Sequence, residues 1–236
     1  MIDHLWLSPH LDDAVLSSGG AIAAARARGE TVRVLTLCTR PPALTSPFIE
    51  ALHTAWALAA SDVIPVRTEE DQRALAILGV RDVVYGDLED AVYRRPLDYA
   101  TMETLLGGSI ADGDDVVEAF ERVIAPHVAD AHNVYAPLAV GGHVDHRAVR
   151  TTAERTARRL FLYEDVPYVI SSGVSGEGAG HEIEITAQIE AKIAAIACYA
   201  TQLRALFGSA AAMPQAIRDY HRRGDRFVER IWTALR

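Results

Sequence analysis

Residues 5–20 read LWLSPHLDDAVLSSGG, and this stretch joins a strand, a polar turn and a helix. The apolar run of residues 2–7 predicts a buried strand that stops at Ser8-Pro9, and residues 14–28 have the composition of a helix. The turn between them brings His10, Asp12 and Asp13 together. In an open α/β sheet such a turn lies at the carboxyl end of its strand, where ligands bind.

The side chains of this turn suggest a metal site. An imidazole and two carboxylates suit a divalent ion, and two neighbouring aspartates are costly to bury unless positive charge lies beside them. One aspartate can bind the ion while the other points elsewhere and takes a proton. A helix N-cap alone also favours aspartate at this place, so a second motif has to decide between the two interpretations.

That second motif is GGHVDHR at residues 141–147. It follows an apolar run at residues 134–140, and a helical pattern continues from it to residue 160. If both strands belong to one parallel sheet, both turns open at the same edge, and His143, Asp145 and His146 meet the first motif there. Two histidines and one aspartate are a typical ligand set of catalytic zinc, with a position left for water.

Composition limits the classes of protein that this chain can represent. The 236 residues are half hydrophobic, which fits one folded domain over residues 1–236. A formal charge of −9 argues against nucleic-acid binding, no apolar run is long enough for a membrane span, and the short apolar start does not resemble a leader. Cys38 and Cys198 lie in apolar contexts typical of buried thiols, so a cytoplasmic location is expected. A homo-oligomer is compatible with these features.

The remaining pattern alternates between strands and helices. Strands are predicted at residues 31–39, 80–85, 132–136, 160–170 and 181–186, and helices at residues 48–60, 69–78, 115–125, 187–206 and 214–235. This order predicts an α/β fold with a Rossmann-like, mostly parallel sheet flanked by helices. Residues 88–113 are irregular and predict a lid or binding loop. Residues 17–20 (SSGG) lack a dinucleotide fingerprint and favour close helix contacts instead.

With both motifs in hand, the chain resembles the LmbE-like, or PIG-L, family of zinc-dependent N-deacetylases, over nearly its whole length. The family's first motif, Pro-His-Pro-Asp-Asp-Glu, is similar to residues 9–14, in which Leu11 replaces the second proline and Ala14 the glutamate. Its second motif, His-x-Asp-His, is similar to residues 143–146. The resemblance implies an LmbE-like fold and the removal of an N-acetyl or other N-acyl group from an amino sugar or a glycosylated small molecule.

The resemblance also implies a role for each motif residue. The implied zinc ligands are His10, Asp13 and His146. Asp12 is the implied general base for attack of water on a linear amide, and His143 assists at the oxyanion or the leaving group. Asp145 is implied to orient His143.

Three further residues are predicted to contact substrate. Arg67 begins a segment similar to the family's Arg-x-x-Glu, although a surface arginine at a helix start is an equally ordinary interpretation. Asp90 and Arg94 lie on the irregular segment and are predicted to contact substrate or to form the surface of the lid.

Three other functions compete with N-deacetylation. Amidases of the same family act on larger conjugates. The pair His10 and Asp12 with a distant histidine also fits a non-haem Fe(II) oxygenase, but those ligands belong to all-β jelly rolls. A non-catalytic carbohydrate-binding or regulatory protein is the third alternative, and it would be expected to lack a ligand or the base. Neither a ligand nor the base is missing here, which favours an enzyme.

Overall fold

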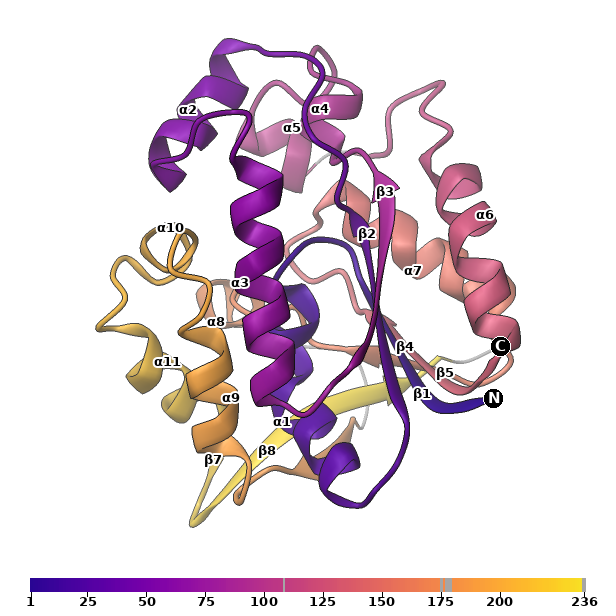
Figure 1. Ribbon diagram of the computed structural model, residues 1–236, viewed down its shortest axis with the longest axis vertical. Coiled ribbons are helices and arrows are strands. Elements are labelled where there is room, and N and C mark those ends of the chain that lie inside the picture. Colours follow the sequence, from indigo (N-terminus) through magenta and orange to yellow (C-terminus); the bar gives the residue numbers. More distant parts are fainter. Residues whose placement is uncertain (108, 175, 177–179, 235–236) are drawn as a thin grey trace.

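The computed structural model describes residues 1–107, 109–174, 176 and 180–234, and a mixed sheet lies at its centre (Figure 1). The strand order is β3-β2-β1-β4-β5-β8-β6, and β7 pairs with β8. Pairing is parallel from β3 to β5 and antiparallel between β5, β8 and β6. The strands are β1 (Ile2–Ser8), β2 (Val32–Cys38), β3 (Asp82–Leu88), β4 (Ala131–Pro137), β5 (Leu160–Tyr163), β6 (His181–Glu184), β7 (Arg222–Arg223) and β8 (Arg226–Thr233).

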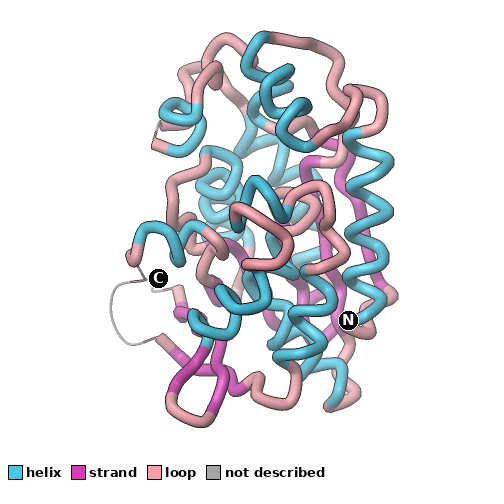
Figure 2. The backbone as a smooth tube through the Cα atoms, turned by 90° about the vertical axis from the view of Figure 1, so that its left-hand side faces the viewer, coloured by secondary structure: helices cyan, strands magenta, loops and turns pink. Residues whose placement is uncertain are grey.

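Helices cover both faces of this sheet, as the alternating sequence pattern predicts. One layer packs on the apolar cluster that contains Leu16, Leu75 and Ile196, and it is made of α1 (Asp13–Ala27), α3 (Val63–Ile77), α8 (Tyr168–Ser172), α9 (Ile189–Ile196), α10 (Leu203–Phe207) and α11 (Met213–His221). Figure 2, seen from the side of these helices, shows them in front of the strands. The opposite layer consists of α6 (Val116–Ala129) and α7 (Val144–Thr156).

The strand order places the two sequence motifs side by side. β1 pairs with β4 in parallel, with Leu5 opposite Val134 and Trp6 opposite Tyr135. The chain leaves β1 towards β2 through α1, and it leaves β4 towards β5 through α7 on the other face. The two turns therefore flank a topological switch point, where an open sheet leaves a crevice between helices of opposite faces. This arrangement also rules out the all-β jelly roll that the non-haem iron alternative requires.

A small cap lies above this edge of the sheet (Figure 1). It consists of α2 (Pro47–Trp56), α4 (Ala91–Arg94) and α5 (Met102–Leu106), and it has its own apolar cluster of Ile49, Tyr93 and Leu105. Val144, at the start of α7, packs into the same cluster and joins the cap to the second motif. Within the irregular residues 88–113, the described part thus contributes two short helices to this cap, and residue 108 lies outside the described residues.

The predicted helix at residues 214–235 is wrong over its second half. The helix α11 ends at His221, and β8 follows from Arg226 to Thr233, while residue 235 lies outside the described part. The mixture of arginine, glutamate and alanine favours a helix locally, but pairing with β5 and β6 buries Val228 and Trp232 in a strand. Tertiary burial outweighs propensity at this position.

Other boundaries also differ from the sequence prediction. The helix predicted at residues 69–78 begins at Val63, and the one predicted at residues 115–125 continues through Pro126 to Ala129. Residues 187–206 form α9 and α10 rather than one helix, because Tyr199 and Thr201 between them bond Asp71 and Glu70 of α3. The predicted strand at residues 160–170 ends at Tyr163, and α8 begins at residue 168. None of the helices in the described ranges has both the length and the apolar character needed to cross a lipid bilayer.

A buried ion pair fastens α1 to α9 and β8. Lys192 Nζ lies 2.6 Å from Glu229 Oε1 and donates to the carbonyl of Ser17. The Glu229 carboxylate accepts the backbone N–H groups of Gly20 and Ala21, in the middle of α1. A Cβ on Gly20 would lie 2.7 Å from Ile185, so the small residues of this stretch allow the close approach, as predicted.

We expect the variant Lys192→Met to lose about 3–5 kcal/mol of unfolding free energy, because it leaves the Glu229 carboxylate buried without its cation. Urea unfolding followed by circular dichroism measures this loss. The double variant Lys192→Met/Glu229→Gln is the control and should recover part of it. A single variant within about 1 kcal/mol of the natural protein would contradict this account.

Candidate metal centre

The predicted metal ligands come together at the switch point. Asp13 Oδ2 lies 3.1 Å from His10 Nδ1 and 3.3 Å from His146 Nε2. The candidate ligand atoms all lie within 4.8 Å of one another. All three residues are buried: His10 is 7 % exposed, Asp13 6 % and His146 1 %. These separations are those of atoms that share one ion at about 2.0–2.1 Å.

The chemistry of this ligand set fits a metal ion. His146 Nε2 is buried and has no hydrogen-bond partner, a condition that costs about 1–3 kcal/mol unless a partner is supplied. An ion beside Asp13 supplies that partner. Two neutral imidazoles and a carboxylate match the ligands of catalytic zinc sites, which keep a position open.

A carboxylate that the sequence reasoning did not single out holds the second histidine. Asp165 Oδ1 lies 2.6 Å from His146 Nδ1, and Asp165 Oδ2 accepts the backbone N–H of Val140. This contact leaves His146 Nε2 to face Asp13, in the arrangement by which carboxylates orient metal-binding histidines. In the sequence, Asp165 could have been found as a carboxylate that closely follows the β5 strand, at the same edge of the sheet as both motifs.

Asp12 lies beside the ligand set in a setting suited to proton transfer. Its carboxylate is 6 % exposed, and Oδ2 lies 3.4 Å from Arg67 Nη2. Burial raises the pKa of Asp12 to about 7; the charge of Arg67 opposes this rise and that of Asp13 adds to it. A carboxylate with a pKa near neutrality can both accept and return a proton.

His143 lies next to the ligands without a charge of its own. Burial lowers the pKa of the His143 ring well below its ordinary value, and the charges of His10 and His146 lower it further. His143 Nδ1 accepts the backbone N–H of Asp145 at 3.2 Å. The neutral ring therefore carries its proton on Nε2 and can donate it in a hydrogen bond.

The side chain of Asp145 faces His10, whereas the resemblance implied that it orients His143. Asp145 Oδ2 lies 3.2 Å from His10 Nε2, and Oδ1 lies 2.9 Å from Arg94 Nη2. Burial by itself lowers the pKa of His10, yet the charge of Asp90 and the hydrogen bonds with Asp13 and Asp145 raise it well above its ordinary value.

The three predicted substrate contacts also lie around this centre. Arg67 is 7 % exposed, packs 5.2 Å from the Trp56 ring, and has a buried Nε with no partner. Asp90 caps α4 and lies 3.3 Å from His10 Nε2. All three guanidinium nitrogens of Arg94 donate within the protein, to Glu89, Asp114 and Asp145. Arg94 therefore holds neighbouring residues in place rather than facing a substrate.

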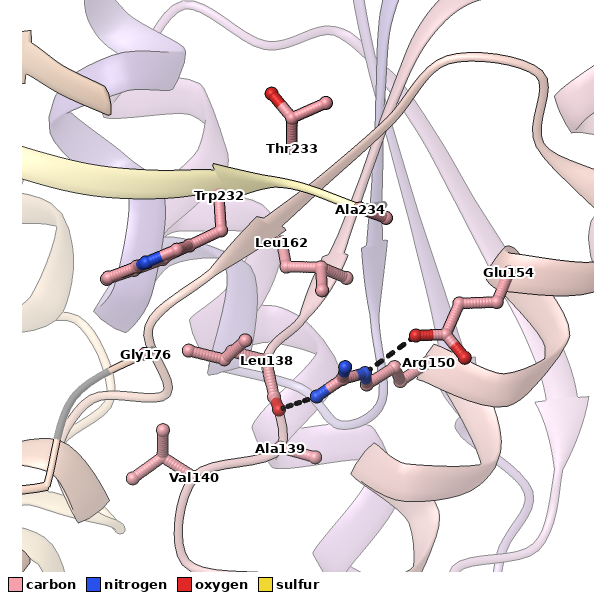
Figure 3. A pocket seen from close by; sticks show the side chains of 10 residues that line it. All are labelled: Leu138, Ala139, Val140, Arg150, Glu154, Leu162, Gly176, Trp232, Thr233 and Ala234. Carbon is pink, nitrogen blue, oxygen red and sulfur yellow. Dashed lines mark hydrogen bonds and ion pairs between the residues drawn. The ribbon is translucent and has the colours of Figure 1, made fainter. Parts of the chain in front are cut away.

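A separate cavity of about 470 Å³ lies between the segment after β4, α7, β5 and β8 (Figure 3). Leu138, Leu162 and Trp232 form its apolar lining, and Arg150 and Glu154 bond each other at 2.9 Å on its edge. Its lining residues belong to neither motif, and its charged groups are already paired. We assign no chemistry to it.

Fold and site together define an α/β protein with a histidine–aspartate centre at the switch point of its sheet. The model of the PIG-L family, described as GlcNAc-PI de-N-acetylase, matches residues 5–157. The chain therefore belongs to the PIG-L, or LmbE-like, family of deacetylases.

Two similar proteins are named as deacetylases. The 2'-N-acetylparomamine deacetylase of Streptomyces fradiae is 35% identical over 177 residues, which are 70% of this chain and 57% of that protein. The crystal structure of A40926 pseudoaglycone deacetylase is 30% identical, with a TM-score of 0.82 over 98% of this chain and 96% of its own.

Teicoplanin deacetylase is similar at the level of structure as well. Its zinc-inhibited form is 25% identical, with a TM-score of 0.78 and coverage of 98% of each chain. Its complex with teicoplanin is 25% identical, with a TM-score of 0.80, 98% coverage of this chain and 97% of that one.

We expect His146→Ala to weaken zinc binding by more than about 100-fold, because the variant removes a ligand atom. Loss of a residue that only orients a metal ligand weakens binding by roughly 10- to 100-fold. Competition with a chromophoric chelator measures the affinity. His132→Ala, which replaces an exposed histidine, is the matched control and should bind as the natural protein does. Equal affinities of the two variants would contradict this ligand assignment.

Proposed function

We propose that this chain is a zinc-dependent N-deacetylase that hydrolyses the N-acetyl amide of an amino sugar, free or attached to a larger natural product. The observation that carries the proposal is the convergence of a three-residue ligand set with a buried carboxylate of pKa about 7 on one crevice. Its relatives support the substrate class: one acts on 2'-N-acetylparomamine by name, and another was solved with teicoplanin.

In this proposal His10, Asp13 and His146 hold the zinc ion. A zinc ion bound there lowers the pKa of a water molecule and polarises an amide carbonyl. Teicoplanin deacetylase was solved in a zinc-inhibited form, so zinc acts on that relative.

The proton transfers fall to Asp12 in this proposal. As the ionised carboxylate it accepts a proton from the attacking water, and as the acid it returns that proton to the leaving amine. Arg67, 3.4 Å away, favours the ionised form before the attack. One group with a pKa of about 7 can serve in both directions.

His143 is proposed to stabilise the developing oxyanion. Its Nε2–H is free to donate because Nδ1 is occupied by the backbone N–H of Asp145. A neutral imidazole in a buried setting donates a fixed hydrogen bond without first having to gain a proton. The general acid at the leaving nitrogen is therefore Asp12 rather than His143.

Two of the predicted substrate contacts remain part of the proposal. Arg67 has a buried, unpartnered Nε beside Asp12, suited to a hydroxyl or anionic group of the sugar. Asp90, 17 % exposed at its side chain, is placed to accept from a sugar hydroxyl.

We propose a cytoplasmic location, which Cys38 and Cys198 as free thiols support.

We expect Asp12→Asn to keep its zinc but to lose about 10²–10⁴-fold in kcat, because an amide cannot accept the proton. The assay is release of acetate from 2'-N-acetylparomamine and from an N-acetylglucosaminyl glycopeptide, with zinc-loaded and zinc-stripped protein. Asp225→Asn, at an exposed turn, is the matched control. Turnover by Asp12→Asn at the natural rate under saturating zinc would disprove the role of the base.

A further inference from the structure

The two nitrogens of the His10 ring face different surroundings. Nδ1 points to the metal centre, 3.1 Å from Asp13 Oδ2. Nε2 points to the cap and lies 3.2 Å from Asp145 Oδ2 and 3.3 Å from Asp90 Oδ2. Only the contact with Asp145 also has hydrogen-bond geometry.

Asp145 is held in place from the cap. The residue is completely buried, and its Oδ2 accepts the backbone N–H of Ala91 at 2.9 Å. Its Oδ1 accepts from Arg94 Nη2 at 2.9 Å, and Arg94 is itself bonded to both oxygens of Asp114. A continuous series of contacts therefore runs from Asp114 through Arg94 and Asp145 to the ring of His10.

Asp145 determines where His10 keeps its proton once an ion is bound. Carboxylates face both ring nitrogens, Asp13 at Nδ1 and Asp145 at Nε2, and a carboxylate accepts but does not donate. With an ion on the side of Asp13, the one hydrogen of a neutral His10 ring belongs on Nε2, opposite Asp145. The lone pair then lies on Nδ1, on the side of Asp13 and His146. When a metal binds, it takes the place of a proton on Nδ1, while the Nε2–H bond to Asp145 remains.

We propose that Asp145 is a positioning residue for the metal ligand His10, and that α4 of the cap, through Arg94 and the Ala91 N–H, prearranges the metal centre. This inference rests on the proposed function only for the place of the ion. The carboxylate of Asp145 acts through His10 rather than His143, because the latter receives only the backbone N–H of Asp145.

The surroundings of His10 Nε2 do not form a second ion site in this interpretation. His10, Asp90, His143 and Asp145 also have candidate ligand atoms within 4.8 Å of one another. However, Asp145 already accepts from Arg94, Ala91 and His10, and the Arg94 guanidinium 2.9 Å away repels a cation. A second ion would also require His10 to lose its remaining proton.

The first test is the zinc affinity of Asp145→Asn, measured by chelator competition in the absence of substrate. We expect a 10- to 100-fold weaker affinity, as for loss of other carboxylates that orient a metal-bound histidine. Asp112→Asn, which makes the same change at an exposed aspartate, is the control, and we expect less than about a threefold change.

The second test separates the two histidines as targets of Asp145. In a His143→Ala background, Asp145→Asn should weaken zinc binding by the same factor as in the natural protein, because the two changes act on different rings. If Asp145→Asn leaves the zinc affinity unchanged, or changes it only when His143 is present, Asp145 does not act through His10 and the inference is wrong.

The third test needs no variant and therefore does not depend on the folding of Asp145→Asn. Nitrogen-15 NMR of the histidine rings in zinc-loaded protein should show His10 bound through Nδ1, with a slowly exchanging proton on Nε2. Coordination through Nε2, or tight binding of a second equivalent of zinc, would overturn the inference. None of the three tests uses an acylated substrate, so failure to deacetylate leaves their outcome intact.

Discussion

The constraint on which the rest of the structure depends is the burial of many charges at one edge of the sheet. Three aspartates, Asp12, Asp13 and Asp145, are buried within this crevice. Buried charges are tolerated only when they are paired and hydrogen-bonded. The protein meets this requirement with a different set of partners for each carboxylate, although His10 is shared by Asp13 and Asp145.

The pairing separates two neighbouring aspartates into opposite functions. Asp13 faces His10 and His146, and its pKa lies well below the ordinary value despite burial, chiefly through the charge of His146. Asp12 faces a single arginine at a longer distance, and its pKa is about 7. One carboxylate is thereby suited to bind a cation and the other to exchange a proton, although they are adjacent in the chain.

The cap and the sheet contribute unequally to this edge. The sheet positions the two motifs through the pairing of β1 with β4, which depends on buried apolar strands. The cap contributes Arg94, Ala91 and Asp90, whose contacts reach the ring of His10 from the other side. The cap is therefore bonded directly to one of the candidate metal ligands.

The sequence by itself predicted the α/β class, and it singled out the histidines and aspartates of two motifs as neighbours in space, because strand ends can be predicted from local patterns. An apolar run ended by polar residues predicts a strand end, and parallel strands bring such ends to one edge. Only the tertiary structure decided which carboxylate faces which imidazole. The partners of Asp145 and Asp165 lie far away in the chain, and the strand β8 exists because distant strands pair with it. Contacts of this kind depend on packing in three dimensions, which no local pattern encodes.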